Sequence, residues 1–171
     1  QQIDANAKDI QKLLKEKTAL LEYVIADSVV HIFYVDKNEL RWAEKTLNNK
    51  ELKGNIKELH QVLSDYDLLV KTAERSYQKY TELAHWFYKN LVAIALKGNA
   101  TQNINKLIIV SDGELGHLPF EAFLVESPPQ TPTDYHLLHY LCNDYKISYN
   151  YSATLWQSSK NAEKLNNNGQ L

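Results

Sequence analysis

The chain has 171 residues, of which 44% are hydrophobic and 23% charged, with a formal net charge of −2. The chain is long enough to bury a core, and its apolar content is higher than that of disordered chains. Length and composition therefore indicate one globular domain, or one domain with an attached helical piece. The small net charge excludes the global basic field of a nucleic-acid binding protein, and no stretch resembles a signal peptide or reaches transmembrane length, so we expect a cytoplasmic protein without nucleic-acid or membrane partners.

The chain divides into three parts on its pattern. Residues 1–19 have apolar side chains at helical spacing and are predicted to form a helix that ends an upstream helical or repeat region. Residues 20–160 are predicted to form the domain, and residues 161–171 a polar tail. The sequence contains no methionine and closes on Asn-Asn-Asn-Gly-Gln-Leu, so we expect a piece of a larger protein.

The first half of the domain predicts a hairpin followed by helices. A β-branched and aromatic run alternates between two faces from Val30 to Val35, and Asp-Lys-Asn then supplies a turn before a hairpin partner at residues 40–45. From residue 55 to 96 the pattern is helical, with a break near residues 64–67. The last part of it predicts one long amphipathic helix from Val70 that ends at Gly98.

The second half begins with a buried strand. Residues 107–110 (LIIV) are four consecutive apolar residues after Lys106, and a strand that is apolar on both faces is typical of a central parallel strand. Four further segments follow: a loop, a short helix, a second core strand and a helix capped by Ser152 or Thr154, at residues 127–132, 136–145, 146–152 and 152–165. The order of elements predicts an α/β fold, a three-layer sandwich with a mostly parallel central sheet, preceded by the N-terminal helix and hairpin.

A serine, an aspartate and a histidine lie within seven residues, at Ser111, Asp112 and His117. Triad residues normally converge from separate loops, and neighbouring residues of a strand point in different directions. A turn at Asp112-Gly113, followed by a helical turn that Pro119 starts, is therefore the favoured interpretation. An esterase that uses Ser111 and His117 remains a weaker hypothesis.

The one cysteine, Cys142, excludes an intramolecular disulfide. It is a candidate nucleophile with His136 or His139 as base, but its helical pattern favours a small buried hydrophobic residue. His136 and His139 have a spacing that can bind a metal, yet no further ligand completes a set, so we expect surface histidines and no metal. Three other histidines have no visible partner in the sequence: His31, His60 and His85.

Three segments together resemble CHAT domains, the caspase-like cysteine peptidases commonly found after tetratricopeptide arrays. "LIIVSDGELGHLPFEAF" (107–123) resembles the family's strand that runs into Asp-Gly and then Leu-Pro-Phe-Glu-Ala, and "ISYNYSATL" (147–155) is similar to the end of its next strand. Residues 20–40 are similar to the entry hairpin. The resemblance implies structural roles for nine signature residues: Asp112, Gly113, Leu118, Pro119, Phe120, Glu121, Ser152, Ala153 and Thr154.

The resemblance also implies a caspase-like sandwich whose full-length form hydrolyses peptide bonds with a cysteine and a histidine. In the family, a His-Gly follows one later strand and the cysteine follows the next, both beyond the position of Leu155, after which this sequence has neither residue type. We therefore expect a scaffold portion that is inactive by itself, with no catalytic residue and no cofactor.

The implied partners are a protein or peptide substrate and upstream helical repeats. The alternative is a non-catalytic interaction module with the same fold. A sheet edge left unpaired beside residues 107–110 or 146–152 also predicts self-association.

Overall fold

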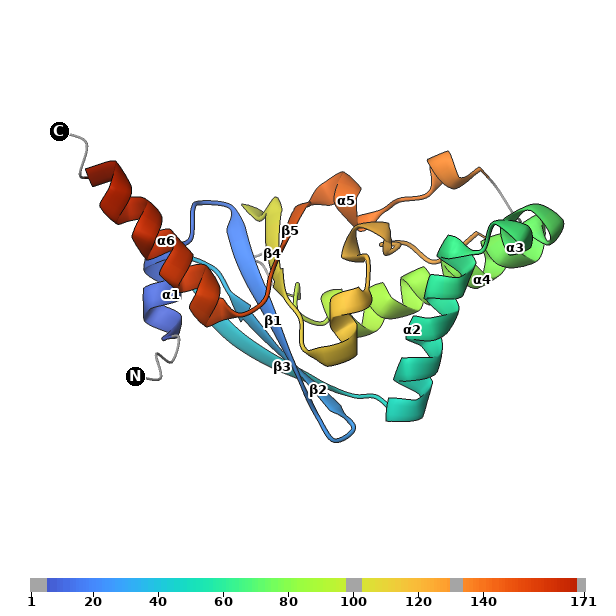
Figure 1. Cartoon of the computed structure of the whole chain (residues 1–171), viewed down its shortest axis with the longest axis horizontal. Coiled ribbons are helices and arrows are strands. Elements are labelled where there is room, and N and C mark those ends of the chain that lie inside the picture. Colours follow the sequence, from blue (N-terminus) through green and yellow to red (C-terminus); the bar gives the residue numbers. More distant parts are fainter. Residues whose placement is uncertain (1–5, 98–102, 130–133, 169–171) are drawn as a thin grey trace.

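A five-stranded sheet forms the centre of the computed structural model, which describes residues 6–97, 103–129 and 134–168 (Figure 1). The strand order is β3-β2-β1-β4-β5, with β1 (Thr18–Ala26), β2 (Val29–Val35), β3 (Leu40–Thr46), β4 (Lys106–Val110) and β5 (Lys146–Asn150). Strands β1, β2 and β3 pair antiparallel, whereas β4 pairs parallel with both β1 and β5. The α/β class is thus confirmed, and the described sheet is mixed: two of its strand pairings are parallel, and two are antiparallel because the short loops between β1, β2 and β3 allow only antiparallel pairing.

The first strand of the chain, β1, is the central strand of this sheet. Helix α1 (Ala7–Leu13) is shorter than predicted, since the chain from Thr18 onward pairs with β2 and β4. The predicted turn after Val35 is confirmed. There the buried Asp36 accepts the backbone N–H groups of Asn38 and Glu39, each at 2.7 Å, which closes a turn typical of aspartate.

Three helices follow the hairpin: α2 (Asn49–Ser64), α3 (Tyr66–Lys71) and α4 (Ala73–Phe87), the last continuing as a π-helical turn over Tyr88–Val92. The break predicted near residues 64–67 is confirmed at Asp65. The single long helix from Val70 is wrong, because Thr72 leaves helical geometry between α3 and α4. Its predicted end at Gly98 lies outside the described residues.

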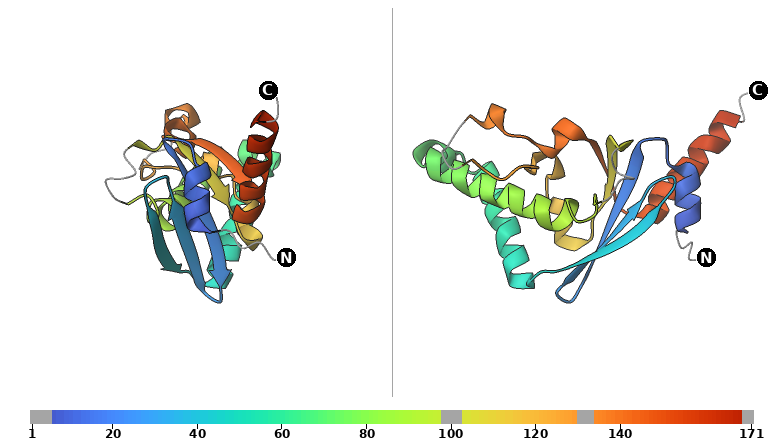
Figure 2. Two further views of the ribbon diagram at one scale, coloured as in Figure 1. Left: turned by 90° about the vertical axis from the view of Figure 1, so that its left-hand side faces the viewer. Right: turned by 180° about the vertical axis from the view of Figure 1, so that it is seen from behind.

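Helices pack on both faces of the sheet (Figures 1 and 2). On one face, Leu21, Tyr23, Leu107 and Ile109 join the main core with apolar residues of α2, α4 and the segment after β4. On the other face, α1 and α6 (Ala153–Asn168) lie side by side over a smaller cluster of apolar residues. These two clusters follow from the strand period of two, because alternate residues of β1 and β4 face opposite sides. Helix α6 extends into the segment predicted as a polar tail.

The segment between β4 and β5 consists mostly of short turns. Three-residue to five-residue 3-10 turns span Gly113–His117, Phe120–Ala122 and Tyr135–Leu137, and α5 (Leu141–Asp144) is only four residues long. The single helix predicted over residues 136–145 is therefore wrong. An isolated antiparallel bridge pairs the backbone of Tyr140 with that of Leu124. A helix through Tyr140 would lose this pairing.

Strand β5 forms one edge of the sheet and β3 the other. The predicted open edge is thus present at residues 146–150. The alternative edge beside residues 107–110 is wrong, since β4 is paired on both sides. In the part of the chain that the structure describes, no helix combines the length and the apolar character that crossing a membrane requires.

Candidate functional site

The first signature segment lies at the carboxyl ends of the parallel strands. Strand β4 ends at Val110, and the chain then turns at Asp112 and Gly113. Gly113 has φ +53°, a left-handed conformation that glycine adopts without the cost of a side chain. The Asp112 carboxylate accepts the backbone N–H of Ile25 at 2.9 Å, beyond the last β1–β4 residue pair, Glu22 and Val110. Asp112 therefore ties the turn to β1 where the strand ladder has ended.

The Leu-Pro-Phe-Glu-Ala turn places aromatic rings in the main core. Leu118, Phe120 and Phe123 are buried. The Phe120 ring lies 4.8 Å from that of Phe123 and 5.4 Å from that of Tyr23, measured between ring centroids. Pro119 immediately precedes the 3-10 turn over Phe120–Ala122. This segment packs as scaffold beneath the sheet rather than presenting side chains to solvent.

Tyr149 on β5 joins the two signature segments. Its hydroxyl donates to Glu121 Oε2 at 2.5 Å and accepts the backbone N–H of Phe120 at 2.9 Å. Burial of the phenol and the neighbouring Glu121 carboxylate raise the pKa of Tyr149 well above that of an ordinary tyrosine. Glu121 therefore has the hydrogen-bonding position that the resemblance implies, with a partner on the adjacent strand.

The second signature segment starts helix α6. Ser152, rather than Thr154, caps this helix, because its hydroxyl accepts the backbone N–H of Leu155 at 3.0 Å. Ala153 is buried, and its backbone N–H meets the Glu22 carboxylate of β1. Burial raises the pKa of Glu22, and the hydrogen bond from Ala153 opposes that rise. These contacts hold the first turn of α6 against the central strand.

A hollow of about 280 Å³ lies beside the Asp112-Gly113 turn. Apolar side chains of β1 and α2 form part of its wall, while Asp112, Glu114 and Lys53 supply charge. Lys53 and Glu114 form an ion pair with 2.8 Å between Nζ and Oε1. The hollow thus combines an apolar wall with mixed charges at the carboxyl edge of the parallel strands.

The structure does not assemble the triad suggested by the first segment. No hydrogen bond joins Ser111 to His117 among the described residues, and the Asp112 carboxylate is held by Ile25. The exposed His117 ring lies edge-on to that of His60 with 6.3 Å between centroids. The turn interpretation of this segment therefore agrees with its geometry.

Cys142 is exposed, so the prediction of a small buried residue is wrong. In the short helix α5 the preceding Leu141 occupies the buried position and directs Cys142 outward. No hydrogen bond joins its thiol to a histidine within the described part of the chain, where no group of three or more His, Cys, Asp or Glu side chains is arranged to hold a metal ion either.

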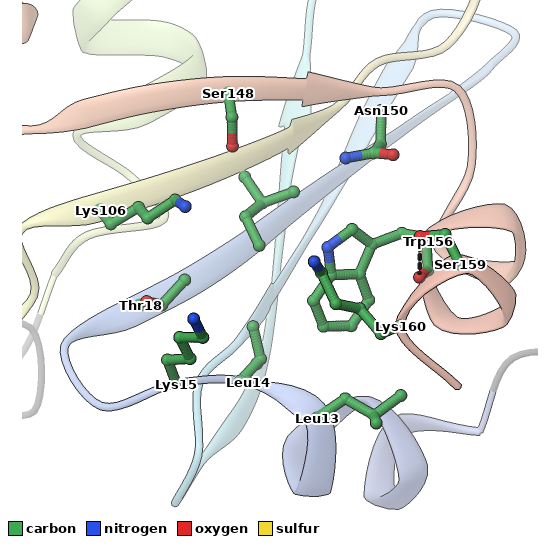
Figure 3. Close-up of a pocket in the computed structure, with 11 residues that line it drawn as sticks. Leu13, Leu14, Lys15, Thr18, Lys106, Ser148, Asn150, Trp156, Ser159 and Lys160 are labelled. Atoms are coloured by element: carbon green, nitrogen blue, oxygen red, sulfur yellow. Dashed lines mark hydrogen bonds between the residues drawn. The ribbon is translucent and has the colours of Figure 1, made fainter. Parts of the chain in front are cut away.

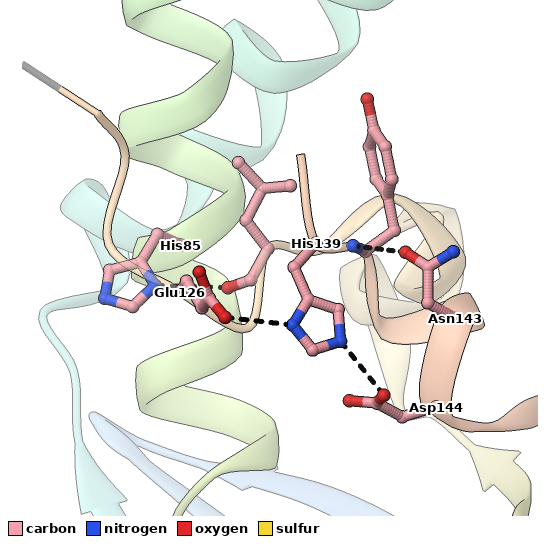
Figure 4. A network of polar contacts seen from close by, with 7 residues as sticks. His85, Glu126, His139, Asn143 and Asp144 are labelled. Carbon is pink, nitrogen blue, oxygen red and sulfur yellow. Dashed lines mark hydrogen bonds and ion pairs between the residues drawn. The ribbon is translucent and has the colours of Figure 1, made fainter. Parts of the chain in front are cut away.

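His139 is held between two carboxylates (Figure 4). Its Nε2 lies 2.9 Å from Asp144 Oδ1, and its Nδ1 lies 3.2 Å from Glu126 Oε1. These hydrogen bonds, with Asp144 first and Glu126 second, raise the pKa of His139 above its ordinary value of 6.5. With both ring nitrogens engaged, His139 is not oriented as the base of a nucleophile. His136 is exposed and does not join this cluster.

Sequence reasoning missed the Glu126–His139–Asp144 cluster. Glu126 is thirteen residues from His139 and approaches it only because the Leu124–Tyr140 bridge brings the two segments together. His85 and His31, which have no partner visible in the sequence, also gain contacts in the fold. His85 Nδ1 lies 3.1 Å from the Leu124 carbonyl oxygen. The His31 ring stacks on that of Trp42 at 6.3 Å.

Comparison with known proteins gives one family. The model of the CHAT domain matches residues 81–171, which begin within α4 and include both signature segments. No curated protein sequence matches the chain. A solved structure titled "Crystal structure of apo psk41 parM protein" resembles it with a TM-score of 0.40 and 12% identity, over 96% of this chain and 46% of that one. This chain thus spans less than half of that protein, and a likeness at this score supports no inference.

Proposed function

The chain belongs to the CHAT domain family, and from this membership we propose that it is the N-terminal scaffold portion of a caspase-like cysteine peptidase. The proposal places the catalytic cysteine and histidine outside this sequence, in strands that would continue the sheet beyond β5. The observation that carries it is the convergence of both signature segments at one place. Tyr149 of the second segment donates a hydrogen bond to Glu121 of the first, and Asp112 of the first accepts the backbone N–H of Ile25 near the carboxyl end of β1.

In the proposed reaction, the histidine takes the proton of the cysteine thiol and the thiolate attacks the carbonyl carbon of a peptide bond. The histidine then protonates the leaving amine, and water hydrolyses the resulting thioester. This chain contributes none of these groups. Its residues hold the strand ends in place, and the hollow beside Asp112 is positioned to receive part of the substrate.

The contacts of the candidate nucleophile and of the candidate base in this chain support the proposal that the chain alone is inactive. Cys142 is exposed with no histidine hydrogen-bonded to its thiol among the described residues, while His139 is engaged on both nitrogens. A thiol that no neighbouring base activates is a weak nucleophile.

The test compares this chain with a longer product of the same reading frame, both assayed on a library of fluorogenic peptides. We expect no cleavage by the chain alone, and cleavage by the longer product that is lost when its downstream cysteine is replaced by alanine. Cleavage by the chain alone that the Cys142→Ala variant abolishes would overturn the proposal. Labelling of Ser111 by a fluorophosphonate probe would instead support the esterase hypothesis.

A non-catalytic interaction module is the second candidate, and the outer part of the hairpin favours it. Leu40 and Trp42 on β3 are 53% and 60% exposed, on the sheet face that α1 and α6 cover only at one end. Contiguous exposed apolar side chains on the surface of a protein mark interaction sites. This candidate would be favoured by a longer product that has no peptidase activity but binds a partner protein. The Trp42→Ser substitution should then abolish that binding.

The remaining expectations are also proposals. We propose that α1 follows upstream helical repeats, that the chain self-associates through the free edge of β5, and that it functions in the reducing cytoplasm. The exposed, unpaired Cys142 is compatible with a reducing compartment.

A further inference from the structure

A second hollow lies on the sheet face opposite the signature turn. Helices α1 and α6 and strands β4 and β5 enclose a volume of about 310 Å³ (Figure 3). Its apolar part is made by Leu14, Ile108 and Trp156, which are all buried. Leu14 directly follows α1, whereas Ile108 lies on β4 and Trp156 on α6, so the hollow is built by separate parts of the fold. It shares no residue with the hollow beside Asp112.

Three lysines surround this hollow, which we call the lysine pocket. Lys15 follows α1, Lys106 begins β4 and Lys160 lies on α6, and their ammonium groups point toward the space between them in Figure 3. Lys160 pairs with Glu163 at 2.7 Å. Within the described ranges, Lys15 and Lys106 form no ion pair, and none of the described lining residues is acidic. The lining residues therefore carry a net positive charge that the described part of the protein compensates only at Lys160.

The register of the sheet adds a fourth cation beside the pocket. Lys146 on β5 is the direct neighbour of Lys106 on β4. Like charges at directly paired positions of adjacent strands destabilise a sheet. Since no ion pair of Lys146 occurs among the described residues either, nothing in that part of the protein offsets this repulsion. A bound anion would offset it.

Neutral donors also face the pocket. The period of two places Ser148 and Asn150 of β5 on the same sheet face as Lys106. The Asn150 amide has no hydrogen-bond partner among the described residues, and Figure 3 shows it directed into the hollow. The Ser148 hydroxyl donates only a long hydrogen bond, 3.4 Å, to the Leu107 carbonyl oxygen. The Asn150 amide is thus available to an acceptor oxygen of a ligand, and Ser148 can donate to one only by exchanging its long bond to Leu107.

We propose that the lysine pocket binds an amphiphilic organic anion, an aromatic or aliphatic group that carries a phosphate or a carboxylate. The apolar group lies against Leu14, Ile108 and Trp156, and the anionic group meets the ammonium groups of Lys15 and Lys106. The volume is at the small end of the range for ligand sites and suits one ring system with its charged group. Lysine binds such groups as a point charge through charge-assisted hydrogen bonds.

The test is isothermal titration of the chain with 1-naphthyl phosphate, 1-naphthoate and the uncharged 1-naphthol. We expect one or both anions to bind at one site, more weakly as the salt concentration rises, because partly exposed charges are screened. The anion that binds more tightly shows whether the pocket prefers a phosphate or a carboxylate. Absence of binding by both anions, or equal binding of 1-naphthol, overturns the proposal.

Two double variants locate the binding. Lys15→Gln with Lys106→Gln removes two charges from the pocket and is expected to weaken anion binding by roughly tenfold or more. Lys50→Gln with Lys57→Gln removes two charges from the exposed surface of α2 and serves as the matched control, with a change of less than about twofold. Equal effects of the two pairs would assign the binding to net charge and overturn the proposal. Thermal unfolding of both variants verifies that they are folded.

Discussion

Replacing Tyr149 by phenylalanine tests whether one hydroxyl holds the two signature segments together. The substitution keeps the ring, which lies 6.2 Å from that of Phe120, and removes only the oxygen that joins Glu121 Oε2 and the Phe120 N–H. Two hydrogen bonds are lost, one of them to a carboxylate. Tyr149 is 43% exposed, so water partly replaces them, and we expect the free energy of unfolding to fall by about 1–2 kcal/mol.

The assay is urea unfolding of the chain, followed by circular dichroism and by fluorescence, with the midpoint and slope fitted together. The matched control is Tyr151→Phe, because Tyr151 is 95% exposed and no hydrogen bond of its hydroxyl occurs among the described residues. That control should change the free energy by less than about 0.5 kcal/mol. Combining Tyr149→Phe with Glu121→Gln should give less than the sum of the single effects, since the first removes and the second weakens the same hydrogen bond.

The reasoning fails if Tyr149→Phe is no more destabilising than Tyr151→Phe. It also fails if the effects of Tyr149→Phe and Glu121→Gln add within error, because the hydroxyl and the carboxylate would then act independently. A change in the slope instead of the midpoint would place the effect in the compactness of the unfolded or native state rather than in this contact.

Three further outcomes follow from the structure. Because the pKa of His139 is raised, its stabilising effect is present below its ordinary pKa of 6.5 and is lost as the pH rises through the raised value. His139→Gln should therefore lower the melting temperature at about pH 6 more than at about pH 9. Equal shifts at both pH values would refute this. Gly113→Ala should cost about 1 kcal/mol in urea unfolding from backbone strain alone, because φ is +53° and no atom lies within 4 Å of the new Cβ, and an unchanged midpoint would contradict the turn geometry. If the free edge of β5 drives self-association, light scattering over a tenfold concentration range should show a rising mass for the wild type, and Ile147→Pro, which removes an outward amide, should suppress that rise; a constant monomer mass for the wild type would refute it.

Elements with a strong local signal agree between sequence and structure. The β-branched run at Val30–Val35, the four apolar residues of β4 and the Ser152 cap of α6 each depend on neighbours within a few residues. Strand β1 was not predicted as a separate strand. Its Thr-Ala-Leu-Leu-Glu start has no clear alternation, because this part of the strand is buried on both faces.

The family signature was visible in the sequence because it combines turn residues with buried side chains at fixed separations. Asp112 and Gly113 were recognised as a turn from local backbone preference alone. The partners of these residues were not visible. Ile25 is 87 residues from Asp112, and Tyr149 is 28 residues from Glu121, so only the packing of β1, β4 and β5 brings them into hydrogen-bonding distance.

The sequence by itself determined the α/β class, the buried parallel strand β4, the turn after it and the likeness to CHAT domains, because each depends on residue pattern over a short span. Tertiary structure alone decided the central place of β1 between β2 and β4, the exposure of Cys142, the carboxylates around His139 and the lysine pocket. These features depend on segments distant in the chain, and the free energy that joins them comes from burial of a shared core, which no local pattern records.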